Sequence, residues 1–90
     1  MPERTRYHHV SSAIVSALPG KLDSVRAQLA AMPDVEIHAC ERNRIVVVIE
    51  GTSAGNVGDR LAAISVMEGV VAANLVFEHI EREEVGNHDR

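Results

Sequence analysis

Residues able to carry chemistry are few in this chain, and their spacing matches no catalytic or metal-binding pattern. The single cysteine, Cys40, has no second thiol with which to form a disulfide or a CxxC pair. The five histidines are scattered, and adjacent His8 and His9 would point to opposite faces of a strand. The turn LPGK, residues 18–21, lacks the paired thiols that a metal carrier would place there. We therefore expect no metal, no cofactor and no cysteine nucleophile.

A glycine-rich segment, GTSAGNVG at residues 51–58, is the one candidate for a phosphate-binding loop. It lacks the lysine that a P-loop uses to reach the phosphates. Its glycines fit a turn and the loose first turn of a helix. No set of catalytic residues remains, and we expect a protein that is not an enzyme.

Composition and charge further limit the classes of protein to which this chain could belong. Ninety residues make one domain, and with only Tyr7 and Phe77 aromatic, the core must consist of aliphatic residues and methionine. The formal net charge of −4 argues against a nucleic-acid partner, which would favour a basic face or aromatic stacking platforms. The polar N-terminus resembles neither a secretory signal nor a membrane span, so we expect a cytoplasmic protein without membrane insertion.

Periodicity predicts the elements that must position any site. Residues 9–17 are rich in β-branched residues and predict a strand, and apolar residues at spacings of three and four then predict a helix between Pro19 and Pro33. Residues 35–40 alternate apolar and polar, and a turn at residues 41–43 joins them in a hairpin to the aliphatic run 45–49.

The second half of the chain repeats this pattern. Ser53 can cap a second helix whose buried stripe is Val57, Leu61 and Ile64, and Gly69 can end it before a last strand. The order βαββαβ predicts an α+β fold, the ferredoxin-like sandwich, with a four-stranded antiparallel sheet in the order 4-1-3-2 and two helices on one face. We expect this domain to cover residues 8–80, with residues 1–7 and 81–90 as flexible tails.

Five consecutive aliphatic residues, 45–49, raise the question of what covers the second face of this sheet. Taking the register of neighbouring strands as uninterrupted, the residues expected to face the helices are Ala13, Val15, Ala17, Val35, Ile37, Ala39, Ile45, Val47, Ile49, Ala73, Leu75 and Phe77. The far face then carries Val10, Ser12, Ile14, Ser16, His38, Cys40, Val46, Val48, Ala72, Asn74 and Val76, with an acidic rim of Glu36, Glu50 and Glu78. An exposed apolar patch of this kind usually marks an interaction surface, and acidic neighbours suit an amphipathic helix with basic residues.

Four segments in this order and spacing, HVSSAIVSA, MPDVEIHA, RIVVVIEG and MEGVVAANLVF, resemble the NapD family. The resemblance covers about residues 8–81. It implies a cytoplasmic chaperone that binds the twin-arginine signal peptide of the periplasmic nitrate reductase catalytic subunit and delays export until the molybdenum cofactor is inserted. Two positions depart from the family's pattern: Phe77 stands where Tyr is frequent and Glu78 where His is frequent.

The resemblance and the residue pattern meet on the far face of the sheet. Its apolar residues would take the apolar part of the signal peptide, and Glu36, Glu50 or Glu78 could face the arginines. Two alternatives stay open at this point. One is a regulatory domain that binds a small molecule such as an amino acid, and the other is a dimerisation domain, since an unoccupied face could also form a weak homodimer.

Overall fold

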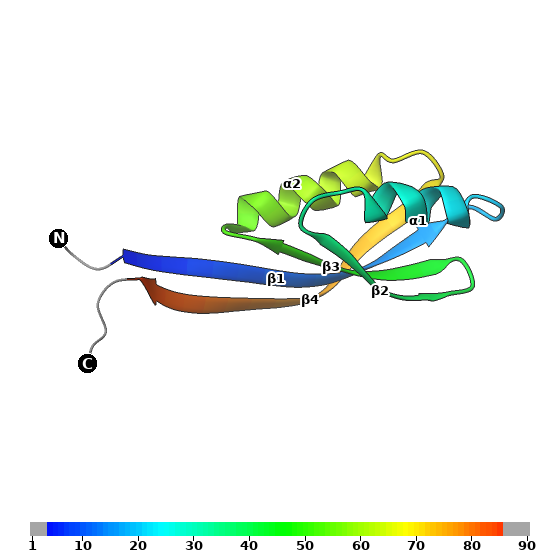
Figure 1. The fold of residues 1–90 in the computed structure, drawn as a ribbon. Coiled ribbons are helices and arrows are strands. Elements are labelled where there is room, and N and C mark those ends of the chain that lie inside the picture. Colours follow the sequence, from blue (N-terminus) through cyan, green and yellow to red (C-terminus); the bar gives the residue numbers. More distant parts are fainter. Residues whose placement is uncertain (1–3, 86–90) are drawn as a thin grey trace.

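The computed structural model describes residues 4–85, and the side chains of residues 8–81. The elements follow in the order β1 (Arg4–Ala17), α1 (Leu22–Ala30), β2 (Val35–Glu41), β3 (Arg44–Gly51), α2 (Ala54–Ser65) and β4 (Val70–Val85) (Figure 1). This is the predicted βαββαβ order.

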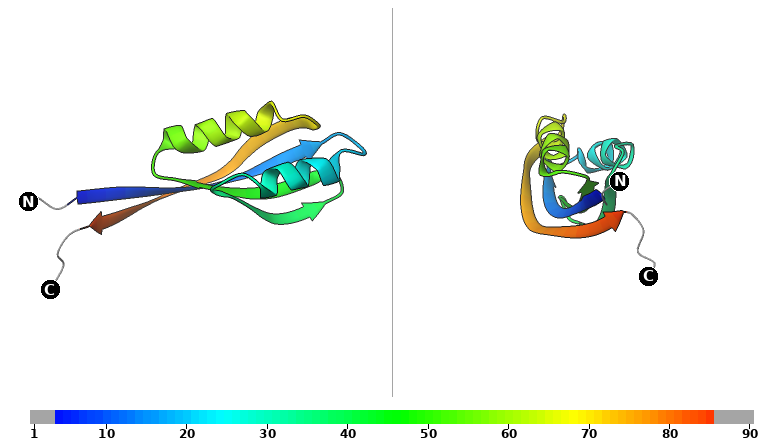
Figure 2. Two further views of the ribbon diagram at one scale, coloured as in Figure 1. Left: turned by 45° about the horizontal axis from the view of Figure 1, so that its top comes forward. Right: turned by 90° about the vertical axis from the view of Figure 1, so that its left-hand side faces the viewer.

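The four strands form one antiparallel sheet in the order β2-β3-β1-β4, which is the predicted order read from its other edge. Both helices lie on the same face of this sheet, and the end-on view in Figure 2 shows both of them above the strands, with β4 curling along the opposite side. The expectation of a ferredoxin-like sandwich is therefore confirmed.

The core lies between the two helices and the inner strands. On β1 every second residue from His9 to Ala17 is buried, and on β3 the same holds for residues 45, 47 and 49. Val25 and Leu29 of α1 and Val57 and Ile64 of α2 pack against them. These positions follow the predicted stripes, because the period of each element places its apolar residues on one side.

Local signals set where the helices begin and end. The Oγ of Ser53 accepts a hydrogen bond from the backbone N–H of Asn56 at 3.1 Å, as expected of a residue that caps the helix N-terminus. Between α2 and β4, Gly69 has a φ of 93°, and a Cβ there would lie 3.0 Å from Cγ2 of Val25. Only glycine fits this corner without strain.

Strands β1 and β4 are longer than expected. β1 begins at Arg4 and β4 ends at Val85, and the ladder between them pairs Arg4 with Val85 and Tyr7 with Arg82. Residues 4–7 and 81–85, expected to be parts of flexible tails, therefore belong to a two-stranded ribbon that runs past the helices (Figure 1). Residues 1–3 and 86–90 of those predicted tails lie outside the described residues.

This ribbon makes the molecule elongated, with principal extents of 55 × 21 × 20 Å. Its radius of gyration is 15.6 Å, whereas a compact chain of this length would have about 12 Å. One end of the sheet therefore protrudes beyond the helix-covered core.

Three register shifts interrupt the ladders. They place several residues on the face of the sheet opposite to the one predicted. On β4, Leu75 pairs with Ala13 but Phe77 pairs with Ser12, so Val76 has no Cα partner. A second shift on the same strand leaves Val71 without a Cα partner. On β2, Ile37 pairs with Val47 but Ala39 pairs with Val46, which leaves out His38. Each is a one-residue bulge, and such a bulge reverses the face of every residue beyond it.

Four predicted placements were therefore wrong. Phe77 lies on the face away from the helices, because it is opposite Ser12, and Glu78 lies on the helix side, opposite Ser11. Ala39 also moves to the face away from the helices, opposite Val46, while Cys40 moves to the helix side, opposite Ile45. Side chains directly opposite one another in an antiparallel ladder share a face, which gives these assignments.

Candidate functional site: the open face of the sheet

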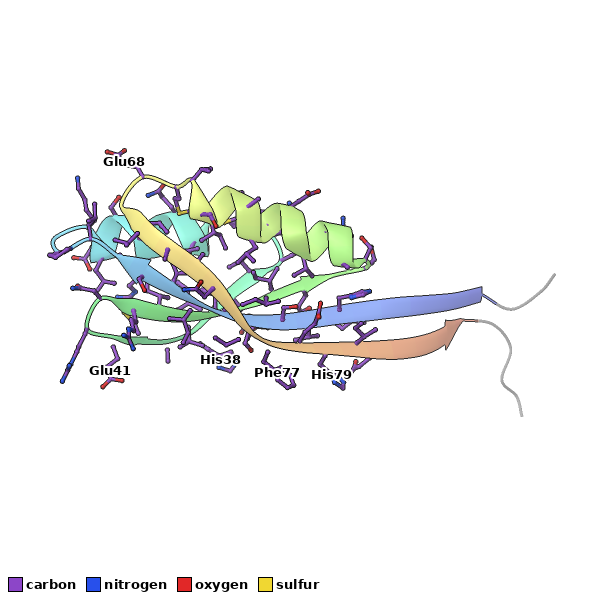
Figure 3. All side chains as sticks on the ribbon, turned by 180° about the vertical axis from the view of Figure 1, so that it is seen from behind. His38, Glu41, Glu68, Phe77 and His79 are labelled. Carbon is purple, nitrogen blue, oxygen red and sulfur yellow. The ribbon has the colours of Figure 1, made fainter. Side chains whose placement is uncertain are left out.

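The face of the sheet away from α1 and α2 is here called the open face. Cross-strand pairs order its residues in rows, with Ile14 beside Val46, Ser12 beside Val48 and Val10 beside Glu50. Figure 3 shows the labelled side chains of His38, Glu41, Phe77 and His79 on this side of the sheet, away from both helices.

Six apolar residues on this face form what we call the apolar floor: Val10, Ile14, Ala39, Val46, Val48 and Phe77. The three central ones, Ile14, Val46 and Val48, are partly buried by their neighbours on the sheet, and no helix covers them. Phe77 is 58% exposed. A large apolar ring left in water on a strand is costly unless a partner covers it.

Most residues predicted for the far face lie on it. Val10, Ser12, Ile14, Val46 and Val48 do so through the β1–β3 register, and Ala72 and Asn74 do so because they pair with Ser16 and Ile14. Val76 is the unpaired residue of a bulge and is 56% exposed. Phe77 and Ala39 were missed, because the local alternation of each strand is compatible with either face once a bulge is allowed.

The acidic residues around the floor differ from the predicted rim. Glu36 and Glu50 lie on the open face, opposite Val48 and Val10 respectively. Glu78 does not, and Glu81 joins the face in its place, opposite His8. The acidic groups therefore gather toward the protruding ribbon more than around the whole floor.

Two imidazole and carboxylate pairs lie at this ribbon end. Nε2 of His8 is 3.5 Å from Oε1 of Glu50, and Nε2 of His79 is 3.5 Å from Oε2 of Glu81. The ring of His79 is nearly parallel to that of Phe77, with centroids 6.5 Å apart and an interplanar angle of 8°. All four polar groups remain accessible to water, so a partner could reach them without a change of fold.

The opposite end of the open face is formed by the β2–β3 hairpin. A shallow hollow of about 510 Å³ is lined there by residues 41–44 together with Ile14, Ala39 and Val46. Arg42 and Arg44 bring two guanidinium groups to this end, against the one carboxylate of Glu41. The floor thus runs from an end rich in carboxylates to an end rich in guanidinium groups.

The described residues were also compared with the requirements of a metal site and of a membrane span. Among the described residues, no group of three or more histidine, cysteine or acidic side chains is placed to hold a metal ion. Cys40 is exposed and free. Within residues 4–85, no helix has both the length and the apolar character needed to cross a membrane.

Fold and face together define a small α+β binding domain, in which a helix-backed sheet presents one apolar face. Residues 8–82 match the family described as NapD protein, and the chain belongs to this family. The resemblance inferred from the four sequence segments is therefore confirmed.

Two relatives agree with this assignment. The chain is 47% identical over 76 residues to "Chaperone NapD" from Paracoccus pantotrophus, covering 84% of this chain and 68% of that protein. Its fold matches the solution structure of the E. coli Tat proofreading chaperone NapD with a TM-score of 0.74 and 26% identity, covering 92% of this chain and 87% of the other. Both relatives are named as chaperones, which supports a chaperone role for this chain.

Proposed function

We propose that this protein is a cytoplasmic chaperone that binds the twin-arginine signal peptide of the periplasmic nitrate reductase catalytic subunit. The peptide lies across the open face and is held there until the molybdenum cofactor has been inserted. Membership of the NapD family supports the choice of partner, and the uncovered apolar floor supports the place of binding.

The single observation that carries this proposal is that Ile14, Val46 and Val48 lie on the face without helices. A signal peptide supplies the complementary chemistry, because its apolar segment can form a helix when docked and its arginines precede that segment. An apolar contact of about 500 Å² would contribute roughly 12 kcal/mol at ~25 cal/mol per Å². Since association and helix ordering oppose a large part of this, a dissociation constant between micromolar and nanomolar is expected.

Occupation of the open face explains how such a chaperone would delay export. A signal peptide whose apolar side is packed on the floor presents neither that side nor its arginines freely to the export machinery. Release then depends only on competition for the peptide, and no chemical step is required of the chaperone.

The test is the substitution Val48→Glu, which places a carboxylate in the middle of the floor. We expect the affinity for a synthetic twin-arginine signal peptide to fall about tenfold to a hundredfold, because a charge buried in an apolar contact must lose its water. Isothermal titration calorimetry measures this. Val66→Glu is the matched control, since Val66 is 84% exposed at the end of α2 and lies away from the sheet.

Unchanged affinity in Val48→Glu, with the fold intact by circular dichroism, would rule out the floor as the binding surface. Sedimentation of the free protein at rising concentration tests the alternative of a homodimer through the same face. A specific observation makes that control necessary: Phe77, on the open face of the edge strand β4, is 58% exposed.

A further inference from the structure

Among residues 8–81, whose side chains the structure describes, charge is distributed unequally along the open face, and this gives the face a direction. Glu50 and Glu81, each beside a histidine, lie at the ribbon end. Arg42 and Arg44 lie at the hairpin end. Nothing in the βαββαβ fold requires this separation, because both ends are exposed to water and would tolerate either sign of charge.

The distance between the two ends can be obtained from the strand register. Arg44 pairs with Ser16 and Glu50 pairs with Val10, so the two charges are six residues apart on β3. At ~3.3 Å per residue this is about 20 Å. An α-helix rises 1.5 Å per residue and spans that length with about 13 residues, which falls within the 7–15 residues of a signal peptide's apolar segment.

We propose that the signal peptide docks in one orientation, with its arginine pair over Glu50 and Glu81 and the carboxyl end of its helix over Arg42 and Arg44. This inference rests on the proposed function, and it adds the direction of the peptide and the residues that read its arginines. The floor between the two ends takes the apolar segment.

Two features of the ribbon end fit arginine in particular. Carboxylates bind a guanidinium group through charge-assisted hydrogen bonds, and Glu50 and Glu81 provide two, one for each arginine of the pair. The exposed ring of Phe77, parallel to His79, offers a flat surface on which a guanidinium plane can stack. A lysine ammonium group would pair with the carboxylates, but it has no plane to stack on the ring of Phe77.

The hairpin end fits the other end of the docked helix. A helix carries a partial negative charge at its C-terminus, where the last carbonyl groups lack partners. Arg42 and Arg44 can donate hydrogen bonds to these groups. In the reverse orientation, the peptide's arginines would lie near Arg42 and Arg44 and its carbonyl groups near Glu50, so both ends would be repelled.

Paramagnetic broadening in NMR spectra of the full chain tests the orientation. A nitroxide is attached through a thioether, so that it cannot exchange onto Cys40, to the N-terminus or the C-terminus of a synthetic twin-arginine signal peptide. The N-terminal label should broaden the amide signals of Glu50 and His79 more than those of Ala39 and Arg44. The C-terminal label should do the opposite.

Affinity measurements provide a second, independent test. The double variant Glu50→Gln, Glu81→Gln should weaken binding of the native peptide about fivefold to tenfold, since each exposed pair contributes modestly. It should have no effect on a peptide in which both arginines are glutamine, as a double-mutant cycle requires of a direct pair. Glu68→Gln is the control, because Figure 3 shows Glu68 on the helix side of the molecule.

Two results would overturn the proposed orientation. If the peptide binds but its N-terminal label broadens Arg44 more than Glu50, the orientation is reversed while the proposed function stands. If the Glu50→Gln, Glu81→Gln variant weakens both peptides equally, these carboxylates do not read the arginines. Absence of any binding contradicts the proposed function itself.

Discussion

Ser11 is fully buried on the helix side of β1, and its hydroxyl has no hydrogen-bond partner in the described part of the chain. Its neighbours across the sheet are Ile49 and Glu78. A buried hydroxyl that has lost its water and gained no partner opposes folding. Serine at this position is therefore a source of instability within an otherwise aliphatic core.

The substitution Ser11→Ala should raise the free energy of unfolding by about 0.5–1 kcal/mol, because it removes the unpaired oxygen and keeps the shape of the side chain. Urea denaturation followed by circular dichroism measures the change. Ser53→Ala serves as the comparison and should lower it by ~1 kcal/mol, since Ser53 caps α2 through Asn56. A fall in stability in Ser11→Ala would mean that a water or partner satisfies the hydroxyl.

At the scale of the elements, the bulge at Val76 decides which face of β4 meets the partner. Residues on its N-terminal side, such as Leu75, keep the predicted face, and residues beyond it change sides. Phe77 and Ile80 are nearly equally exposed, at 58% and 51%, but lie on opposite faces of the same strand. They form a natural pair of probes for the register.

Phe77→Ala should weaken signal-peptide binding about tenfold or more, because it removes a large apolar contact from the floor. Ile80→Ala should leave the affinity within twofold of the unsubstituted chain, since Ile80 points to the helix side. Both affinities can be measured by calorimetry with the same peptide. Equal losses in the two variants, or a loss only in Ile80→Ala, would contradict the register of β4.

At the scale of the whole molecule, the protruding ribbon lies apart from the helix-covered core. Among residues 8–81, whose side chains the structure describes, the buried apolar residues lie between Ala13 and Ile64. The ribbon is held by backbone pairing of β1 with β4. It therefore contributes length to the sheet beyond the helix-covered core.

A chain shortened to residues 8–81 should unfold cooperatively, with a free energy of unfolding within ~1 kcal/mol of the full chain, because every core residue that the structure describes lies within this range. It should also keep its affinity for the signal peptide, since Glu50, Glu81 and the floor remain. Thermal unfolding and calorimetry measure the two properties. Loss of a cooperative transition would show that the ribbon stabilises the core.

The fold class and the family were predictable from the sequence because they depend on local patterns. The period-two alternation of residues 9–17 and the aliphatic run at 45–49 determined two central strands, and the stripes of the helices determined which side they cover. Pro33 and Ser53 marked helix boundaries by their own backbone chemistry. These signals depend only on residues close in the sequence, so the sequence alone is enough to identify them.

The composition of the open face was decided only by the tertiary structure. Whether Phe77 faces the helices or the partner depends on how β4 pairs with β1, more than 60 residues earlier in the chain. The same holds for Ala39, whose face is set by pairing with β3, and for Glu81, which joins the open face because β4 continues beyond the bulge at Val76. A bulge leaves no mark in the residues that form it, because its cause is the fit between two strands.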